Sequence, residues 1–121
     1  MKKIYVFLLL ISTTFMLTAQ DTYFQDSTLR IQEKAQKVTD QYNDELALTA
    51  KQDLLFQKKV EEFLIRRNKI ETTLVGKEQL DALYKMQVQE TKEMGDILTR
   101  PQMDLYKKIK STIQPIKVVN D

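Results

Sequence analysis

Four segments of the chain carry apolar residues at helical spacing. In the first segment, successive apolar residues are separated by four, three, four and four positions, which places them on one face of an α-helix. This set is Ile31, Ala35, Val38, Tyr42 and Leu46. Asp26 and Ser27 are both residue types that cap helix N-termini well. We therefore predict a first helix from Asp26 or Ser27 to about Leu46.

The second and third helices are predicted on either side of Gly76, which breaks the pattern. The second runs from Thr49 to about Thr73, and its apolar residues are Phe56, Val60, Phe63, Ile70 and Leu74. The third runs from about Lys77 towards Ile97, with Leu80, Leu83, Tyr84, Val88 and Met94. A fourth is expected from Thr99 to about Ile113, because the residue before Pro115 leaves helical geometry.

The composition agrees with this helical pattern. The chain has 121 residues, of which two are Gly and two are Pro, and 30% are charged. Strands need frequent turns, and Gly and Pro supply most tight turns. So few of these residues, together with many Lys, Glu, Gln, Leu and Met, favour helix almost everywhere. We predict an all-α fold of about four helices in one domain, residues 21–121.

The first twenty residues, "MKKIYVFLLLISTTFMLTAQ", have the pattern of a secretory signal peptide. Two lysines precede a short apolar run, and small or polar residues follow it. We expect cleavage near Ala19 or Gln20 and a periplasmic location for the mature protein. The alternative is an uncleaved anchor, but the apolar run is well short of the roughly 20 residues that a spanning helix needs. We expect no stable membrane anchor.

The absence of two residue types excludes several kinds of chemistry. The chain has no Cys and no His, so it has no disulfide, thiol nucleophile, imidazole base or conventional zinc site. No acidic run has the spacing of a calcium loop. Without Lys2 and Lys3 the chain has 17 basic and 17 acidic residues, a balance that does not indicate nucleic acid. We expect no enzyme activity, no cofactor and no metal.

A short motif, L-T-x-x-Q, occurs twice. The two copies are "LTAKQ" at 48–52 and "LTRPQ" at 98–102. If the threonine is the N-cap, its hydroxyl accepts from a first-turn amide and the glutamine reaches back to the N-cap amide, which is a capping box. The motif residues are Leu48, Thr49 and Gln52 in the first copy, and Leu98, Thr99 and Gln102 in the second. Each cap is expected to contribute about 1 kcal/mol.

Two such motifs in a small, exported, helical chain resemble the Spy/CpxP family of periplasmic LTxxQ-motif proteins. The second copy, in "GDILTRPQMDLYKKI", has the family's isoleucine–leucine pair before the motif and an aromatic residue, Tyr106, four places after its Gln. The first copy, in "ALTAKQDLLFQKKVEEF", matches in the motif and in the helix that follows. The resemblance covers residues 46–113.

The resemblance implies a thin, curved four-helix hairpin that forms a cradle-shaped homodimer. It implies an ATP-independent periplasmic chaperone that binds unfolded or misfolded envelope proteins and limits their aggregation. One alternative is a regulator that binds and damps the periplasmic domain of an envelope-stress sensor. A third possibility is a structural helical protein whose motifs are only helix caps and which has no client. Because the chain has no His, a zinc-responsive role is disfavoured.

The second helix carries the candidate client-binding residues. Basic residues lie on one side of it and aromatic residues on another, so it could attract an unfolded chain by charge and hold it by apolar contact. The candidates are Lys51, Phe56, Lys58, Lys59, Phe63, Arg66, Arg67 and Lys69. The simpler interpretation is that the basic side is a solvated face and the apolar side is core.

Two further groups have a structural and a functional interpretation. Met86, Met94 and Met103 fit either an adaptable binding surface or a core with gap-filling side chains, and we favour the core. The carboxylates Glu90 and Glu93, with Asp96, are close in sequence but lack a partner base. We expect these carboxylates to form a solvated face.

Overall fold

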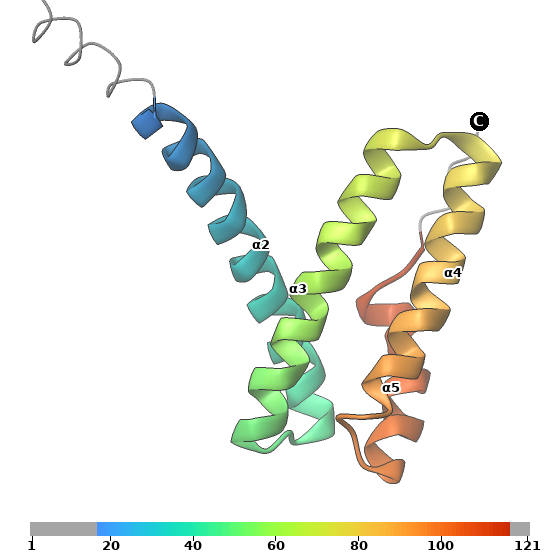
Figure 1. Ribbon diagram of the computed structural model, residues 1–121. Coiled ribbons are helices and arrows are strands. Elements are labelled where there is room, and N and C mark those ends of the chain that lie inside the picture. Colours follow the sequence, from blue (N-terminus) through green and yellow to red (C-terminus); the bar gives the residue numbers. More distant parts are fainter. Residues whose placement is uncertain (1–16, 117–121) are drawn as a thin grey trace, which may run out of the picture. The chain divides into compact units, whose positions relative to one another are not determined.

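The computed structural model describes the backbone of residues 17–116 and the side chains of residues 27–116. The chain divides into two units, residues 1–30 and residues 31–121. All regular structure in the described part is helical, as Figure 1 shows, which confirms the all-α prediction. The helices are α2 (Leu17–Leu46), α3 (Ala50–Thr73), α4 (Gly76–Met94) and α5 (Arg100–Ile113). Most of the predicted signal peptide lies outside the described residues.

Six of the eight predicted helix bounds hold within one residue, and two are corrected. The prediction that the first helix begins at Asp26 or Ser27 is wrong, because α2 already includes Leu17. No Gly or Pro between these positions interrupts the helix, so nothing in the backbone stops it there. The third helix ends at Met94 rather than near Ile97, and Gly95 follows its last residue.

Within residues 31–121, α3 and α4 contact each other and form a hairpin. Figure 1 shows that the connection between α2 and α3 and the connection between α4 and α5 lie at the same end of this hairpin. The first connection turns through Ala47, whose positive φ of 52° is the left-handed conformation that often follows a helix. The side chain of Asn43 accepts a hydrogen bond from the amide of Leu48 at 2.8 Å and fixes this turn.

The core of this unit centres on three aromatic rings from three helices. Tyr42 of α2 lies 5.1 Å, between ring centroids, from both Phe56 of α3 and Tyr106 of α5. The rings of Phe56 and Tyr106 meet edge to face at 5.9 Å. Such pairs add about 0.5–1.5 kcal/mol beyond the area that they bury. The other members of the core cluster are Ala35, Leu46, Val60, Met94 and Leu98.

Two of the three methionines within residues 27–116, Met94 and Met103, are packed in or against the core, as the core interpretation predicts. Met94 is fully buried in the core, and Met103 is partly buried against it. Met103 also follows the second motif, so it contributes to packing at the start of α5. Met86 is of intermediate exposure.

Candidate functional site

Both L-T-x-x-Q motifs form the predicted capping boxes. The hydroxyl of Thr49 accepts from the amide of Gln52 at 3.1 Å, and Oε1 of Gln52 accepts from the amide of Thr49 at 3.0 Å. In the second copy the hydroxyl of Thr99 accepts from the amide of Gln102 at 3.4 Å, and Oε1 of Gln102 accepts from the amide of Thr99 at 2.9 Å. The motifs therefore begin α3 and α5.

The two motifs also bind each other, which sequence reasoning did not foresee. Nε2 of Gln52 donates to Oε1 of Gln102 at 2.8 Å, and Nε2 of Gln102 donates back to Oε1 of Gln52 at 3.2 Å. Each Nε2 also donates to a carbonyl in the opposite connection, Ile97 at 3.1 Å and Leu46 at 3.2 Å. The residues that cap two helices thus also join the two helix connections.

Leu48 and Leu98, the first residues of the two motifs, complete this junction. Leu98 is buried in the core cluster, and Leu48 is partly buried against it. Both leucines therefore tie the motifs to the core. The repeated leucine, threonine and glutamine of each motif therefore have separate structural roles: packing, capping and cross-connection.

A buried ion pair connects α4 to α5. Nζ of Lys110 lies 2.9 Å from Oε1 of Glu90, and both side chains are less than a tenth exposed. Lys110 also donates to the hydroxyl of Thr91 at 2.9 Å and to that of Tyr106 at 3.0 Å. The expectation that Glu90 lies on a solvated face is therefore wrong. A carboxylate can occupy the interior because Lys110, also buried, supplies the opposite charge.

Burial shifts the titration of both partners. Desolvation raises the pKa of Glu90 above its usual value, and the ammonium of Lys110 opposes this shift. Desolvation also lowers the pKa of Lys110, and Glu90 opposes that shift. Burial likewise raises the pKa of Tyr106. These groups are buried and bound to one another, so we assign them a structural role.

The two predicted client-binding aromatic residues face the interior. Phe56 is fully buried in the aromatic core, and Phe63 is 2% exposed. A partner could not reach either ring without opening the hairpin, so the assignment of Phe56 and Phe63 to client contact is corrected: they are core residues. Both residues therefore follow the simpler interpretation, in which the apolar side of α3 is core.

The six predicted basic residues divide into two groups. Lys59, Arg66 and Arg67 are engaged in ion pairs with Glu62, Glu93 or Glu71 at 2.9–3.2 Å. The guanidinium of Arg66 also lies 4.8 Å above the ring centroid of Phe63. The other three lie on the exposed side of α3 and make no ion pair within the described residues: Lys51, Lys58 and Lys69.

The same side of α3 carries apolar residues that sequence reasoning missed. Leu54 is 58% exposed and Ile65 is 54% exposed. Together with Lys51, Lys58 and Lys69 they follow the helix at spacings of three, four, seven and four, which is one face. We call this face the outer stripe of α3: Lys51, Leu54, Lys58, Ile65 and Lys69. The signal was present in the sequence, because neither Leu54 nor Ile65 shares the face of Phe56 and Phe63.

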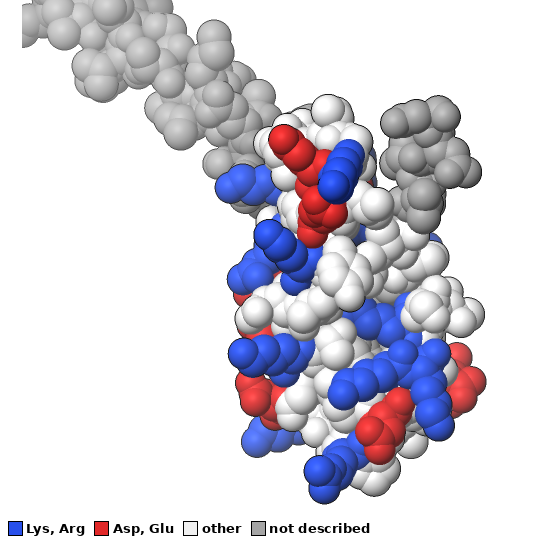
Figure 2. All heavy atoms as spheres, turned by 90° about the vertical axis from the view of Figure 1, so that its right-hand side faces the viewer, with Lys and Arg blue, Asp and Glu red and all other residues white. Residues whose placement is uncertain are grey.

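A second exposed apolar row lies on α4. Leu80, Tyr84 and Val88, spaced four residues apart, are between 37% and 64% exposed. Figure 2 shows the side of the molecule where α4 and α5 lie, with basic side chains scattered among uncharged and acidic ones. This face mixes apolar and charged residues and has no continuous basic field.

Other classes of site find no support in the part of the chain that the structure describes. The residues whose side chains the structure describes, 27–116, contain no group of three or more acidic residues placed to hold a metal ion. No helix among these residues is both long and apolar enough to cross a membrane. Comparisons with protein-family models, with curated proteins and with solved structures found no match to this chain.

Proposed function

We propose that this protein is an exported, ATP-independent chaperone that binds unfolded or misfolded proteins of the periplasm and limits their aggregation. The observation that carries the proposal is the outer stripe of α3, where Leu54 and Ile65 remain more than half exposed among three lysines that make no ion pair with any residue of 27–116. Charge can attract an unfolded chain from a distance, and apolar contact can then hold it. The exported location follows from the signal-peptide pattern of residues 1–20.

The helix beneath this stripe supports the proposal because it is held firmly from the other side. Phe56, Val60 and Phe63 are buried within the unit, so the outer residues are presented on a fixed surface. No nucleotide or metal is required, since binding would be governed by exposed area and charge. An unfolded chain offers many short apolar segments, and a narrow stripe can contact such segments without a deep pocket.

The protein is proposed to act as a homodimer that pairs through α4. An exposed row of Leu80, Tyr84 and Val88 is suited to helix–helix packing. If two copies pair antiparallel about Tyr84, Asp81 of one copy lies near Lys85 of the other. Glu78 and Lys92 would be matched in the same way, so the surface is self-complementary, as a two-fold interface requires.

The chaperone proposal is tested by aggregation assays with the double variant Leu54→Ser/Ile65→Ser. Light scattering of a reduced or heat-treated client is measured with and without the mature protein. The wild type should suppress scattering at near-stoichiometric ratio, and the variant should lose most of this effect while keeping its helical circular dichroism. Leu29→Ser, which changes a residue that is 54% exposed on α2, is the matched control and should behave as wild type. Equal suppression by the double variant would overturn the assignment of the stripe.

The dimer proposal has a separate test. Analytical ultracentrifugation should find a dimer for the mature wild type and a monomer for Tyr84→Glu, because a buried unpaired carboxylate would oppose pairing. Leu54→Glu is the matched control, since it adds the same charge to a comparably exposed residue on α3. A monomeric wild type, or a Tyr84→Glu variant that still forms the dimer, would refute the role of α4.

A further inference from the structure

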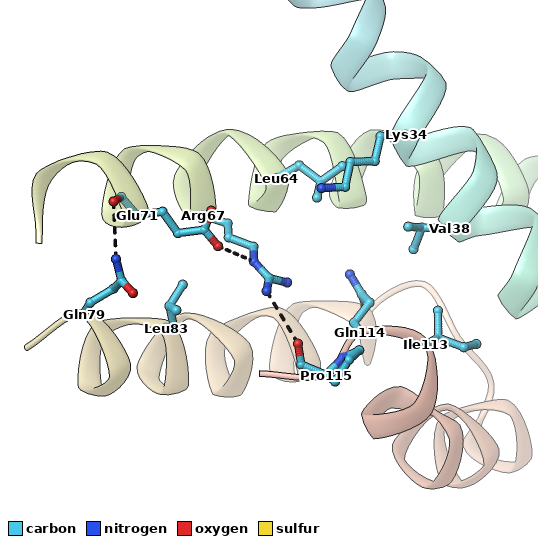
Figure 3. A pocket seen from close by; sticks show the side chains of 10 residues that line it. All are labelled: Lys34, Val38, Leu64, Arg67, Glu71, Gln79, Leu83, Ile113, Gln114 and Pro115. Carbon is cyan, nitrogen blue, oxygen red and sulfur yellow. Dashed lines mark hydrogen bonds and ion pairs between the residues drawn. The ribbon is translucent and has the colours of Figure 1, made fainter. Parts of the chain in front are cut away.

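A groove of about 510 Å³ lies among the helices of the second unit, away from the outer stripe of α3. Figure 3 shows that its lining comes from α2, α3, α4 and the segment that ends α5. This volume is within the range of small-molecule sites, which are roughly 300–1,000 Å³. Each of the four helices contributes one apolar side chain to the lining: Val38, Leu64, Leu83 and Ile113.

Three nitrogen-bearing side chains lie around the same part of this groove. Figure 3 shows the ammonium of Lys34, the guanidinium of Arg67 and the amide nitrogen of Gln114 directed towards the space between them. Lys34 makes no ion pair within the described residues. These groups are donors only, so the space that they surround favours a group that accepts hydrogen bonds.

The orientation of two of these donors is fixed by neighbours. Oε1 of Gln114 accepts from the hydroxyl of Tyr42 at 2.7 Å, which leaves its nitrogen for the groove. Nε of Arg67 donates to Glu71 at 2.9 Å, and one of its outer nitrogens lies 3.5 Å from the carbonyl of Pro115. The second outer nitrogen of Arg67 has no acceptor among residues 27–116. Such preset donors lose little freedom when they bind an oxyanion.

The charge around the groove is positive after internal pairing is counted. Among the described residues, Lys34 and Arg67 are its cations, and Glu71 is its one lining carboxylate. Glu90 lies near Arg67, but its charge is matched by Lys110 at 2.9 Å. One positive charge is left, so the groove complements a ligand with a single negative charge.

We infer that this groove binds a single-chain amphiphile with a carboxylate head, such as a medium-chain fatty acid. The carboxylate lies against Arg67, Gln114 and Lys34, because a guanidinium and an amide match its two oxygens. The carbon chain lies along Leu64, Leu83 and Ile113, which provide apolar contact on three helices. This inference is independent of the chaperone proposal, since it uses none of the residues of the outer stripe.

The inference is tested with decanoate, held below its micelle concentration, and isothermal titration calorimetry. We expect one saturable site and a rise in the melting temperature, because a ligand that contacts four helices binds only the folded state. Decanol should bind at least tenfold more weakly, since it lacks the anionic head. Acetate should show no binding, since it lacks the chain. Equal binding of decanol and decanoate would overturn the role given to the donors.

Two exposed lysines of α2 provide a matched pair of variants. Lys34→Glu should weaken decanoate binding at least tenfold, while Lys37→Glu, which changes an exposed lysine outside the groove, should leave it unchanged. Leu54→Ser/Ile65→Ser should also bind decanoate as wild type does. If Lys37→Glu weakens binding as much as Lys34→Glu, the effect is one of general charge and the site is refuted. Methyl NMR shifts confined to Val38, Leu64, Leu83 and Ile113 would locate the ligand, whereas shifts confined to Leu54 and Ile65 would refute the groove.

Discussion

The inner and outer faces of α3 use similar side chains for opposite purposes. On the inner face, Phe56, Val60 and Phe63 are at most 2% exposed. On the outer face, Leu54 and Ile65 are more than half exposed and alternate with lysines. The apolar residues of one helix therefore divide into those that stabilise the unit and those that remain available to a partner. Substitutions on the two faces should separate folding from binding.

The largest expected effect belongs to the inner face. Phe56→Ala should lower the free energy of unfolding by about 3–5 kcal/mol, because it removes a ring that contacts both Tyr42 and Tyr106. Leu54→Ala on the outer face should change it by no more than about 0.5 kcal/mol. Urea unfolding followed by circular dichroism measures both. Similar losses for the two variants would contradict the division between the faces.

The buried ion pair behind the inner face should show the next largest effect. Glu90→Gln should cost about 3 kcal/mol, because it leaves the charge of Lys110 buried without its counter-charge. The double variant Glu90→Leu/Lys110→Met should recover most of this loss, since replacing both partners by apolar groups removes two desolvation penalties. Urea unfolding of the single and double variants forms the test. A double variant less stable than Glu90→Gln would show that the pair contributes net stability.

The glutamine pair should have a smaller effect that is shared by both motifs. Gln102→Ala should cost about 1–2 kcal/mol, because it removes a capping bond and both hydrogen bonds between Gln52 and Gln102. The double variant Gln52→Ala/Gln102→Ala should cost less than the sum of the single variants, because the mutual bonds are lost only once. Gln36→Ala, at an exposed position on α2, is the control. Strict additivity would mean that the two motifs act independently.

The smallest effect is expected at the partly exposed ion pair between Lys59 and Glu93, and it depends on pH. The hydrogen bond from Lys59 lowers the pKa of Glu93 below its usual 4.5. The stabilising contribution of Glu93 is thus complete above pH 4.5 and is lost as the pH falls through the lowered value. Lys59→Met should make the acid side of a stability–pH curve shallower. The Glu93→Gln variant should flatten the same part of the curve, and an unchanged curve in both would contradict the assignment.

The periodicity of the sequence was sufficient to predict the helices but not their contacts. Helix starts are marked by the two threonine caps, and helix ends by Gly76 and Pro115. The bounds of α3 and α5 could therefore be predicted within one residue. Local spacing also identifies which residues share a helix face. Local spacing does not tell which face is covered by other helices. For α3, the apolar face that carries Phe56 could have been either core or a binding surface.

The candidate sites depend on contacts between segments far apart in the chain, and these could not be predicted from spacing. Glu90 and Lys110 are 20 residues apart and meet only because α5 packs against α4. The groove donors Lys34, Arg67 and Gln114 come from three segments. Leu54 and Ile65 are the exception, because their offset from the Phe56–Phe63 face could have been read from the sequence.

The exchange of hydrogen bonds between Gln52 and Gln102 has an evolutionary consequence. Each amide donates a hydrogen bond to the other and accepts one in return, so a glutamate at either position would set a carboxylate against an oxygen. Drift at these two positions should therefore be correlated, with paired replacements tolerated where single ones are not. Among descendants of this chain, the two motifs would be inherited as one unit although about fifty residues of sequence separate them.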